Sequence, residues 1–114
     1  MGGDAVLRAV SSCVQKLIRA EDVFARYGGE EFILLVRGIT HENVHLVAER
    51  ARRAVERLQI PFDGFLVKIT VSIGISSLDE FPVGASIDGL VTLADKRLYA
   101  AKNAGRNQVC SVGL

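Results

Sequence analysis

The sequence has little of what disulfide-rich, membrane-spanning or strongly nucleic-acid-binding proteins need. Its only two cysteines, Cys13 and Cys110, lie in apolar contexts, which favours reduced thiols in a cytoplasmic protein over a disulfide. No apolar run approaches the roughly 20 residues of a membrane-spanning helix, and no basic-then-apolar leader begins the chain. Fourteen basic against thirteen acidic residues leave a net charge of +1, so neither nucleic acid nor a membrane is an expected partner. Any anion binding should be local.

Apolar residues are plentiful by contrast, at 49% of the 114 residues, and their spacing predicts the helices. This content suits a single globular domain over residues 1–114 with a core of its own. Apolar side chains that recur at spacings of three and four predict amphipathic helices over 4–18, 42–58 and 87–101. The predicted N-caps are Asp4 for the first helix, Thr40 for the second, and Ser86 or Asp88 for the third.

Two strands are predicted in the second half of the chain. Residues 66–76 alternate β-branched side chains with polar or small ones, which is typical of a strand. Gly74 within this strand indicates that another element approaches closely there. A short strand is expected over 109–112, after a helix end at which Gly105 supplies a left-handed residue. With the hairpin described next, these elements predict an α/β fold in which a mixed central β-sheet is flanked by helices.

The stretch 24–36 carries the strongest local signal in the chain. Two apolar runs flank Gly28, Gly29, Glu30 and Glu31, and this pattern predicts a hairpin whose glycines permit the turn. Glycine has no Cβ, so a phosphate or sugar can approach the backbone, and adjacent carboxylates are hard oxygen ligands that suit magnesium. The pattern therefore indicates a metal–nucleotide site, with an ordinary solvated turn as the alternative.

Several motifs, in chain order, resemble those of the GGDEF family, the diguanylate cyclases that condense two GTP molecules into cyclic di-GMP. Residues 26–32 read Arg-Tyr-Gly-Gly-Glu-Glu-Phe, which is similar to the family signature with Glu in place of Asp. The other matches are Gly3-Asp4, Arg19-Ala20-Glu21-Asp22, Thr70 to Gly74, and Ala94 to Asn107. Spaced motifs in the right order are far more specific than one loop. The resemblance implies a nucleotide-cyclase-like GGDEF fold over nearly the whole chain.

The resemblance also implies a role for each residue of the site. Glu30 would bind a magnesium or manganese ion, and Glu31 would support the metal or help to deprotonate the attacking 3′-hydroxyl. Lys102 and Arg106 would neutralise the triphosphate of GTP, although two cations beside a helix end also suit its dipole. Two such domains, with one GTP each, would face each other in a homodimer. Further GTP contacts would come from Asp4, Gly28 and Gly29.

Arg19 and Asp22 resemble a second site of the family, the Arg-x-x-Asp motif that binds the product and inhibits the enzyme. There an arginine fork and a carboxylate would hold cyclic di-GMP, with Arg50 as an additional contact. Without the resemblance, Arg19 is a helix-terminal cation, Asp22 a turn residue, and Arg50 part of a solvated helix face. The alternative function that this site suggests is a non-catalytic cyclic di-GMP receptor or regulatory domain.

The family pattern normally begins with a strand and helix that carry an Asp metal ligand, and this chain starts after them. We therefore expect a sheet without its first, central strand, no appreciable cyclase activity from the chain alone, and an upstream regulatory domain in the whole protein. Strands 32–36 and 66–76 would have flanked the first strand and are expected to present unpaired edges. Direct pairing, exchange with a second copy or aggregation would relieve these edges, and association is the favoured outcome. Direct pairing is expected to shift the hairpin relative to Lys102 and Arg106.

Overall fold

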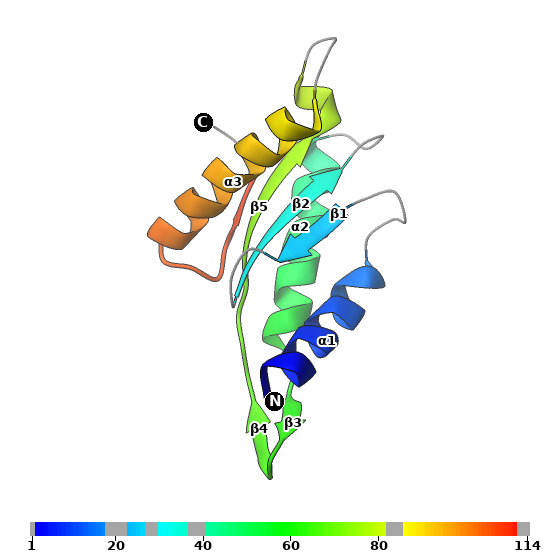
Figure 1. Ribbon diagram of the computed structural model, residues 1–114, viewed down its shortest axis with the longest axis vertical. Coiled ribbons are helices and arrows are strands. Elements are labelled where there is room, and N and C mark those ends of the chain that lie inside the picture. Colours follow the sequence, from blue (N-terminus) through cyan, green and yellow to red (C-terminus); the bar gives the residue numbers. More distant parts are fainter. Residues whose placement is uncertain (1, 18–22, 27–29, 37–40, 82–85, 112–114) are drawn as a thin grey trace.

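The structure, a computed structural model, describes residues 2–17, 23–26, 30–36, 41–81 and 86–111 (Figure 1). The α-helices within these residues are α1 (Gly2–Gln15), α2 (His41–Glu56) and α3 (Ile87–Asn103), and a short 3-10 helix, η1, covers Leu78–Glu80. The strands are β1 (Val23–Arg26), β2 (Glu31–Val36), β3 (Ile60–Phe62), β4 (Phe65–Val67), β5 (Ser72–Ser77) and β6 (Val109–Cys110). No helix in the described part of the chain is long and apolar enough to cross a membrane.

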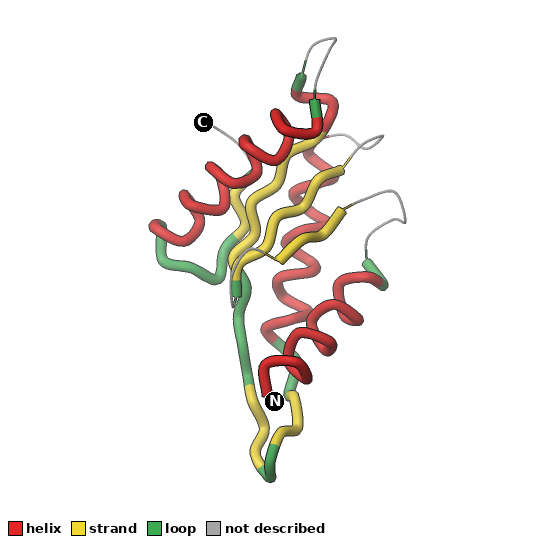
Figure 2. The backbone as a smooth tube through the Cα atoms, viewed as in Figure 1, coloured by secondary structure: helices red, strands yellow, loops and turns green. Residues whose placement is uncertain are grey.

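Four of the strands form one mixed sheet, in the order β1-β2-β5-β6 (Figure 2). β1 and β2 are antiparallel and form the predicted hairpin, in which Arg26 pairs with Phe32. The rings of Phe24 and Phe32 stack across this hairpin with their centroids 4.6 Å apart, which helps to hold its register. The pairs β2–β5 and β5–β6 are both parallel, and β3 and β4 form a separate two-stranded hairpin.

Helices cover both faces of the four-stranded sheet, which confirms the predicted α/β fold (Figure 1). On one face, Val10 and Val14 of α1 join the apolar stripe of α2 over Phe32, Leu34, Val36, Ile73 and Ile75. On the other face, Leu90, Ala94 and Leu98 of α3 cover Ile33 and Leu35. Full burial of an aliphatic side chain stabilises the fold by about 1.5–3 kcal/mol. These two apolar layers therefore hold the sheet between the helices.

Gly74 of β5 allows α3 to approach the sheet closely. A Cβ at this position would overlap the carbonyl oxygen of Ala94 and the backbone nitrogen of Leu98. The neighbouring Ser76 also lies under α3, where its Oγ donates a hydrogen bond to the Leu90 carbonyl at 2.7 Å. The prediction that Gly74 marks a close approach is confirmed, and the small face of this strand is buried under a helix.

The helix boundaries differ from the predicted ones chiefly at α1. This helix begins at Gly2, so Asp4 is its third residue and the prediction that Asp4 is the N-cap is wrong. The sequence suggested a later start because Gly2 and Gly3 are poor helix formers, although an acid in the first turn still interacts favourably with the helix dipole. α3 begins as predicted after Ser86, whose Oγ accepts a hydrogen bond from the Gly89 N–H at 3.0 Å.

The predicted strand over 66–76 is two strands, β4 and β5. β4 turns back on β3 through a two-residue turn in which Asp63 and Gly64 have φ values of 52° and 81°. Two left-handed residues in a two-residue loop favour a tight hairpin. The alternating pattern continued across the break because Ile69 and Val71 still pack on the core between the two strands. Alternation alone therefore could not show where one strand ended.

β2 and β5 pair with each other along six residues, from Glu31 opposite Ser72 to Val36 opposite Ser77. The expectation that these two strands present unpaired edges is therefore wrong, because their facing edges pair with each other. The sheet is closed by direct pairing, which was one of the three expected arrangements. Association is not needed to satisfy the facing backbone groups of β2 and β5.

Cys13 and Cys110, both among the described residues, are not joined in a disulfide. They lie on α1 and β6, and both are half-buried. Burial raises the pKa of the Cys13 thiol, which keeps it protonated at neutral pH.

Candidate functional site

Two segments far apart in the sequence meet at one end of the sheet. Glu31 is the first residue of β2, and Lys102 lies in the last turn of α3. Because α3 packs along β2, its C-terminal end lies beside the start of that strand (Figure 1). Lys102 Nζ lies 3.0 Å from Glu31 Oε2, and Arg106 Nη1 lies 3.7 Å from the same oxygen. We call Glu31, Lys102 and Arg106 the charged cluster.

Direct pairing of the sheet was expected to shift the hairpin relative to Lys102 and Arg106, and in the structure Glu31 of β2 lies beside both cations. β2 runs parallel to β5, and α3 is held on β5 through Gly74, so the start of β2 and the end of α3 stay together. Glu31 is consequently a β-strand residue that faces the helix end. Glu30, immediately before it, is exposed.

The charged cluster is accessible and has unused binding capacity. The side chains of Glu31, Lys102 and Arg106 are 24%, 29% and 60% exposed. An ammonium group has three N–H donors and a guanidinium group five, so each cation can bind further anions besides the Glu31 carboxylate. The site therefore offers hard carboxylate oxygens on one side and phosphate-binding cations on the other.

Arg106 reaches the cluster from a left-handed turn that follows α3. Gly105, Arg106 and Asn107 have φ values of 124°, 62° and 48°. The Arg106 N–H donates to the Ala101 carbonyl at 3.0 Å, which satisfies one of the last carbonyls of the helix. The predicted left-handed Gly105 is confirmed, and the left-handed region extends through the two residues after it.

A buried ion pair that the sequence analysis missed fixes α3 on the sheet. Arg97 is 4% exposed, and its guanidinium donates to Glu80 Oε1 at 2.6 Å and to the Ile75 carbonyl at 2.8 Å. Glu80 also accepts a hydrogen bond from the Ser77 N–H at 2.9 Å, so the pair joins α3 to the end of β5. The signal was available, because Arg97 lies three residues after Ala94 on the apolar stripe of the helix.

Five predicted site residues cannot be placed in full. Gly28 and Gly29 of the hairpin turn lie outside the described residues, as do Arg19 and Asp22 of the predicted product site. The backbone of Asp4 lies in α1, but its side chain is outside the described part. Their predicted contacts with GTP and cyclic di-GMP stay predictions.

Arg50 lies on the exposed side of α2. It is far in sequence from the residues of the charged cluster, and Lys102 of that cluster lies on a different helix, α3. Arg50 lines a pocket of about 440 Å³ together with Arg53 of the same helix and Arg57, which directly follows that helix. Leu17 and Leu46 supply apolar walls, and Glu49 supplies a carboxylate. Three guanidinium groups around an open pocket suit an anionic ligand with flat apolar parts.

The donor set beside the hairpin turn is compatible with magnesium. Magnesium in nucleotide sites is commonly held by one or two carboxylates, with substrate phosphates and water completing the octahedron. Glu30 and Glu31 supply two adjacent carboxylates, and Glu31 is already beside the cations that would face the phosphates. Among the described residues, no three His, Cys, Asp or Glu side chains form a complete protein-only metal site.

Comparisons with known proteins found matches over most of the chain. A family model described as "Diguanylate cyclase, GGDEF domain" matches residues 1–108. Diguanylate cyclase A of Treponema denticola is 42% identical over 107 residues, which are 94% of this chain and 28% of that protein. The probable diguanylate cyclase DgcT of Escherichia coli K12 is 39% identical over 109 residues, or 94% of this chain and 24% of that protein.

A solved structure is also similar to this chain. It is the diguanylate cyclase SiaD of Pseudomonas aeruginosa in complex with its activator SiaC, with a TM-score of 0.73 and 26% sequence identity. The match covers 93% of this chain and 40% of the SiaD chain. The chain thus spans about a quarter of the length of the curated relatives described above, at 28% and 24%.

Proposed function

The chain belongs to the GGDEF domain family of diguanylate cyclases, and on that premise we propose that it is a catalytic domain that condenses two GTP molecules into cyclic di-GMP. The observation that carries the proposal is the charged cluster. It joins the Glu31 carboxylate, two positions after the double glycine, with two cations at the end of α3, at 3.0 and 3.7 Å. A triphosphate with a divalent metal requires both kinds of group side by side.

Lys102 and Arg106 would bind the triphosphate. The planar guanidinium of Arg106 can pair with two phosphate oxygens at once, whereas the ammonium of Lys102 acts as a compact point charge. In the structure the Glu31 carboxylate is the anion beside both cations. The arrival of GTP would exchange this contact for contacts with phosphate oxygens, so the cations would neutralise charge that develops on the leaving diphosphate.

Glu30 and Glu31 are the residues that would hold a magnesium or manganese ion. Such an ion, when bound, would stabilise negative charge on the attacking and leaving oxygens. Glu31 is half-buried at the start of a paired strand, so its position is fixed by the ladder with Ser72. Glu30 is exposed and next to it, and can orient toward the substrate. Glu31 would support the metal or help to deprotonate the attacking 3′-hydroxyl.

The remaining parts of the proposal rest on family membership. Asp4, Gly28 and Gly29 would complete the GTP site, and two domains with one GTP each would face each other in a homodimer. An upstream regulatory domain would control that encounter. Within the whole protein these partners would decide the activity, because the chain corresponds to 28% and 24% of the two curated relatives.

A second candidate function, a cyclic di-GMP receptor without catalysis, is favoured by the pocket on α2. Arg50, Arg53 and Arg57 line it, and cyclic di-GMP offers two phosphates and two flat guanine rings. Arg19 and Asp22 would supply the main clamp, with Arg50 as support. The two functions are compatible in one domain, in which the receptor site would inhibit the catalytic one.

Titration of the chain with GTP in magnesium, followed by calorimetry, tests the proposal. Lys102→Gln should weaken GTP binding by roughly tenfold, because it removes a charged contact to phosphate. Lys96→Gln is the matched control: it removes an exposed lysine from the same helix and should change the affinity by less than about twofold. Equal effects of the two substitutions, or no GTP binding by the folded wild-type chain, would contradict the proposed site.

A further inference from the structure

The turn that carries Arg106 is held in a conformation that its own residues disfavour. Arg106 has a φ of 62° and Asn107 a φ of 48°, and both follow Gly105. The left-handed conformation is unfavourable for residues other than glycine, less so for asparagine, and it persists where the surrounding structure holds it. The question is therefore which contacts hold this turn.

Asn107 is anchored at three atoms. Its backbone N–H donates to Ser72 Oγ at 3.1 Å, which attaches the turn to β5. Its side-chain Nδ2 donates to Glu56 Oε2 at 2.6 Å, and its Oδ1 accepts from Arg52 Nη1 at 2.8 Å. Both ends of the amide are thus bound by charged groups of α2, which fixes its orientation.

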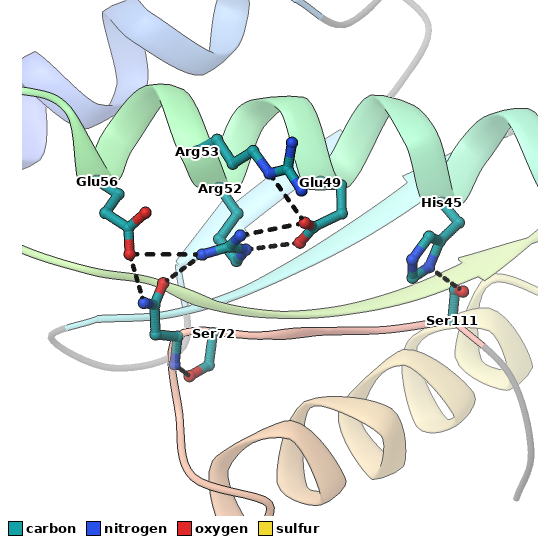
Figure 3. Close-up of polar contacts among 8 residues, drawn as sticks. His45, Glu49, Arg52, Arg53, Glu56, Ser72 and Ser111 are labelled. Carbon is teal, nitrogen blue, oxygen red and sulfur yellow. Dashed lines mark hydrogen bonds and ion pairs between the residues drawn. The ribbon is translucent and has the colours of Figure 1, made fainter.

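Arg52 and Glu56 are themselves held on α2. The Arg52 side chain is 13% exposed and makes a two-point contact with Glu49, from Nε to Oε1 at 2.6 Å and from Nη2 to Oε2 at 3.1 Å (Figure 3). The hydrogen bonding in which Arg52 donates to Glu49 lowers the pKa of the Glu49 carboxyl and raises the pKa of Arg52. Both groups are charged at neutral pH, on a helix whose other face is buried against the sheet.

We propose that Glu56 and Arg52 are positioning residues for Arg106, acting through Asn107. They would hold the left-handed turn so that the Arg106 guanidinium lies beside Glu31, where it meets the triphosphate. Arg106 is adjacent to Asn107 and reaches Glu31 Oε2 at 3.7 Å. This inference rests on the proposed function. It adds α2 to the groups that determine GTP binding, although α2 contributes no member of the charged cluster.

A purely structural role for the network makes a different prediction. The strand after the turn, β6, is already paired with β5, and Ser111 beyond it contacts His45 at 2.7 Å. Residues 109–111 are thus attached to the sheet and to α2 without Asn107. Loss of the Glu56 contact should consequently release the turn and Arg106 before it releases the strand.

A double-mutant cycle on GTP affinity in magnesium tests the inference. Glu56→Ala should weaken binding by roughly fivefold, since it removes a charge-assisted hydrogen bond that orients Arg106. Glu56→Gln keeps an acceptor for Asn107 Nδ2 and should bind GTP within about twofold of the wild type. In an Arg106→Gln background, Glu56→Ala should have no further effect, because its target is gone.

The charge control is Asp88→Ala, which removes an exposed acid from the other end of α3. Removal of an acid should by itself strengthen binding of a polyanion slightly, so weakening by Glu56→Ala is opposite to the general electrostatic effect. Urea unfolding confirms that each variant is folded. If Glu56→Ala does not fold, Asn107→Gly takes its place, because glycine accepts the left-handed turn but lacks the amide.

The outcomes separate the two proposals. Equal weakening by Glu56→Ala with and without Arg106, or an effect like that of Asp88→Ala, would overturn the positioning role and leave the GTP site standing. An Arg106→Gln variant that binds GTP as the wild type does would overturn the proposed grip of Arg106 and the positioning role together. Coupling between positions 56 and 106, with rescue by Glu56→Gln, is the expected result.

Discussion

Replacement of Glu31 by Gln should change the GTP affinity in opposite directions with and without magnesium. Without the metal, the Glu31 carboxylate repels the triphosphate and occupies Lys102 at 3.0 Å and Arg106 at 3.7 Å. Glutamine has nearly the same size and no charge, so it leaves both cations available to phosphate. With magnesium, the same substitution removes a metal ligand and should weaken binding.

The size of the effect follows from the exposure of the three side chains. They are 24%, 29% and 60% exposed, so water screens the contacts and discounts their Coulomb energy. An ion pair of this kind contributes about 1 kcal/mol, which corresponds to roughly a fivefold change in affinity. We therefore expect Glu31→Gln to bind GTP about fivefold more tightly in EDTA and about tenfold more weakly in excess magnesium.

Calorimetric titration in the two buffers measures both affinities on the same protein samples. Asp88→Asn is the charge-matched control, because Asp88 is exposed and lies roughly 21 Å from Lys102 along the axis of α3. This control should change both affinities slightly and in the same direction. A change of the same sign for Glu31→Gln in the two buffers would refute the argument that Glu31 serves both as a competitor of phosphate and as a metal ligand.

Two further predictions concern stability, and urea unfolding measures both. Gly74→Ala should lower the free energy of unfolding by about 3 kcal/mol or more, because the added methyl meets the backbone of Ala94 and Leu98 rather than a movable side chain. Gly89→Ala, whose methyl would meet only the Ser86 and Phe81 side chains, is the control and should change stability by less than about 1 kcal/mol; equal losses would contradict the close approach of α3. Because Arg52 lowers the pKa of Glu49, the stability from this pair is present above the ordinary glutamate pKa and is lost as pH falls through the lowered value. When the pH is lowered from about 5.5 to 3, the free energy of unfolding of the Glu49→Gln variant should therefore fall less than that of the wild type. Equal decreases in the two proteins would show that the Glu49–Arg52 pair does not stabilise the fold.

Much of the fold could be predicted because its signals are local. The glycine turn between two apolar runs predicted β1 and β2, and the spacing of Leu90, Ala94 and Leu98 predicted α3. Gly74 indicated a close contact without naming the partner. Long-range pairing, such as that of β2 with β5, could not be predicted, because neither strand's sequence identifies its partner in a parallel ladder.

The candidate site shows the same division between local and long-range information. The resemblance to the GGDEF family singled out Lys102 and Arg106 at the end of the last helix and Glu31 two positions after the double glycine. Their contact was not predicted, because it depends on how α3 lies on the sheet. The anchoring of Asn107 by Arg52 and Glu56 was missed for a similar reason. The sequence of α2 is typical of a charged surface helix, and Asn107 lies 55 positions after Arg52 and 51 after Glu56.

The measurement that tests the central claim most directly is the ratio of the affinities of the wild-type chain for GTP and GMP in magnesium. If Lys102 and Arg106 bind the triphosphate beside Glu31, GMP lacks the phosphates that they contact and should bind at least about tenfold more weakly. Both nucleotides present the same guanine and ribose, so this ratio isolates the contribution of the two outer phosphates. Equal affinities would contradict the assignment of the charged cluster as the triphosphate site.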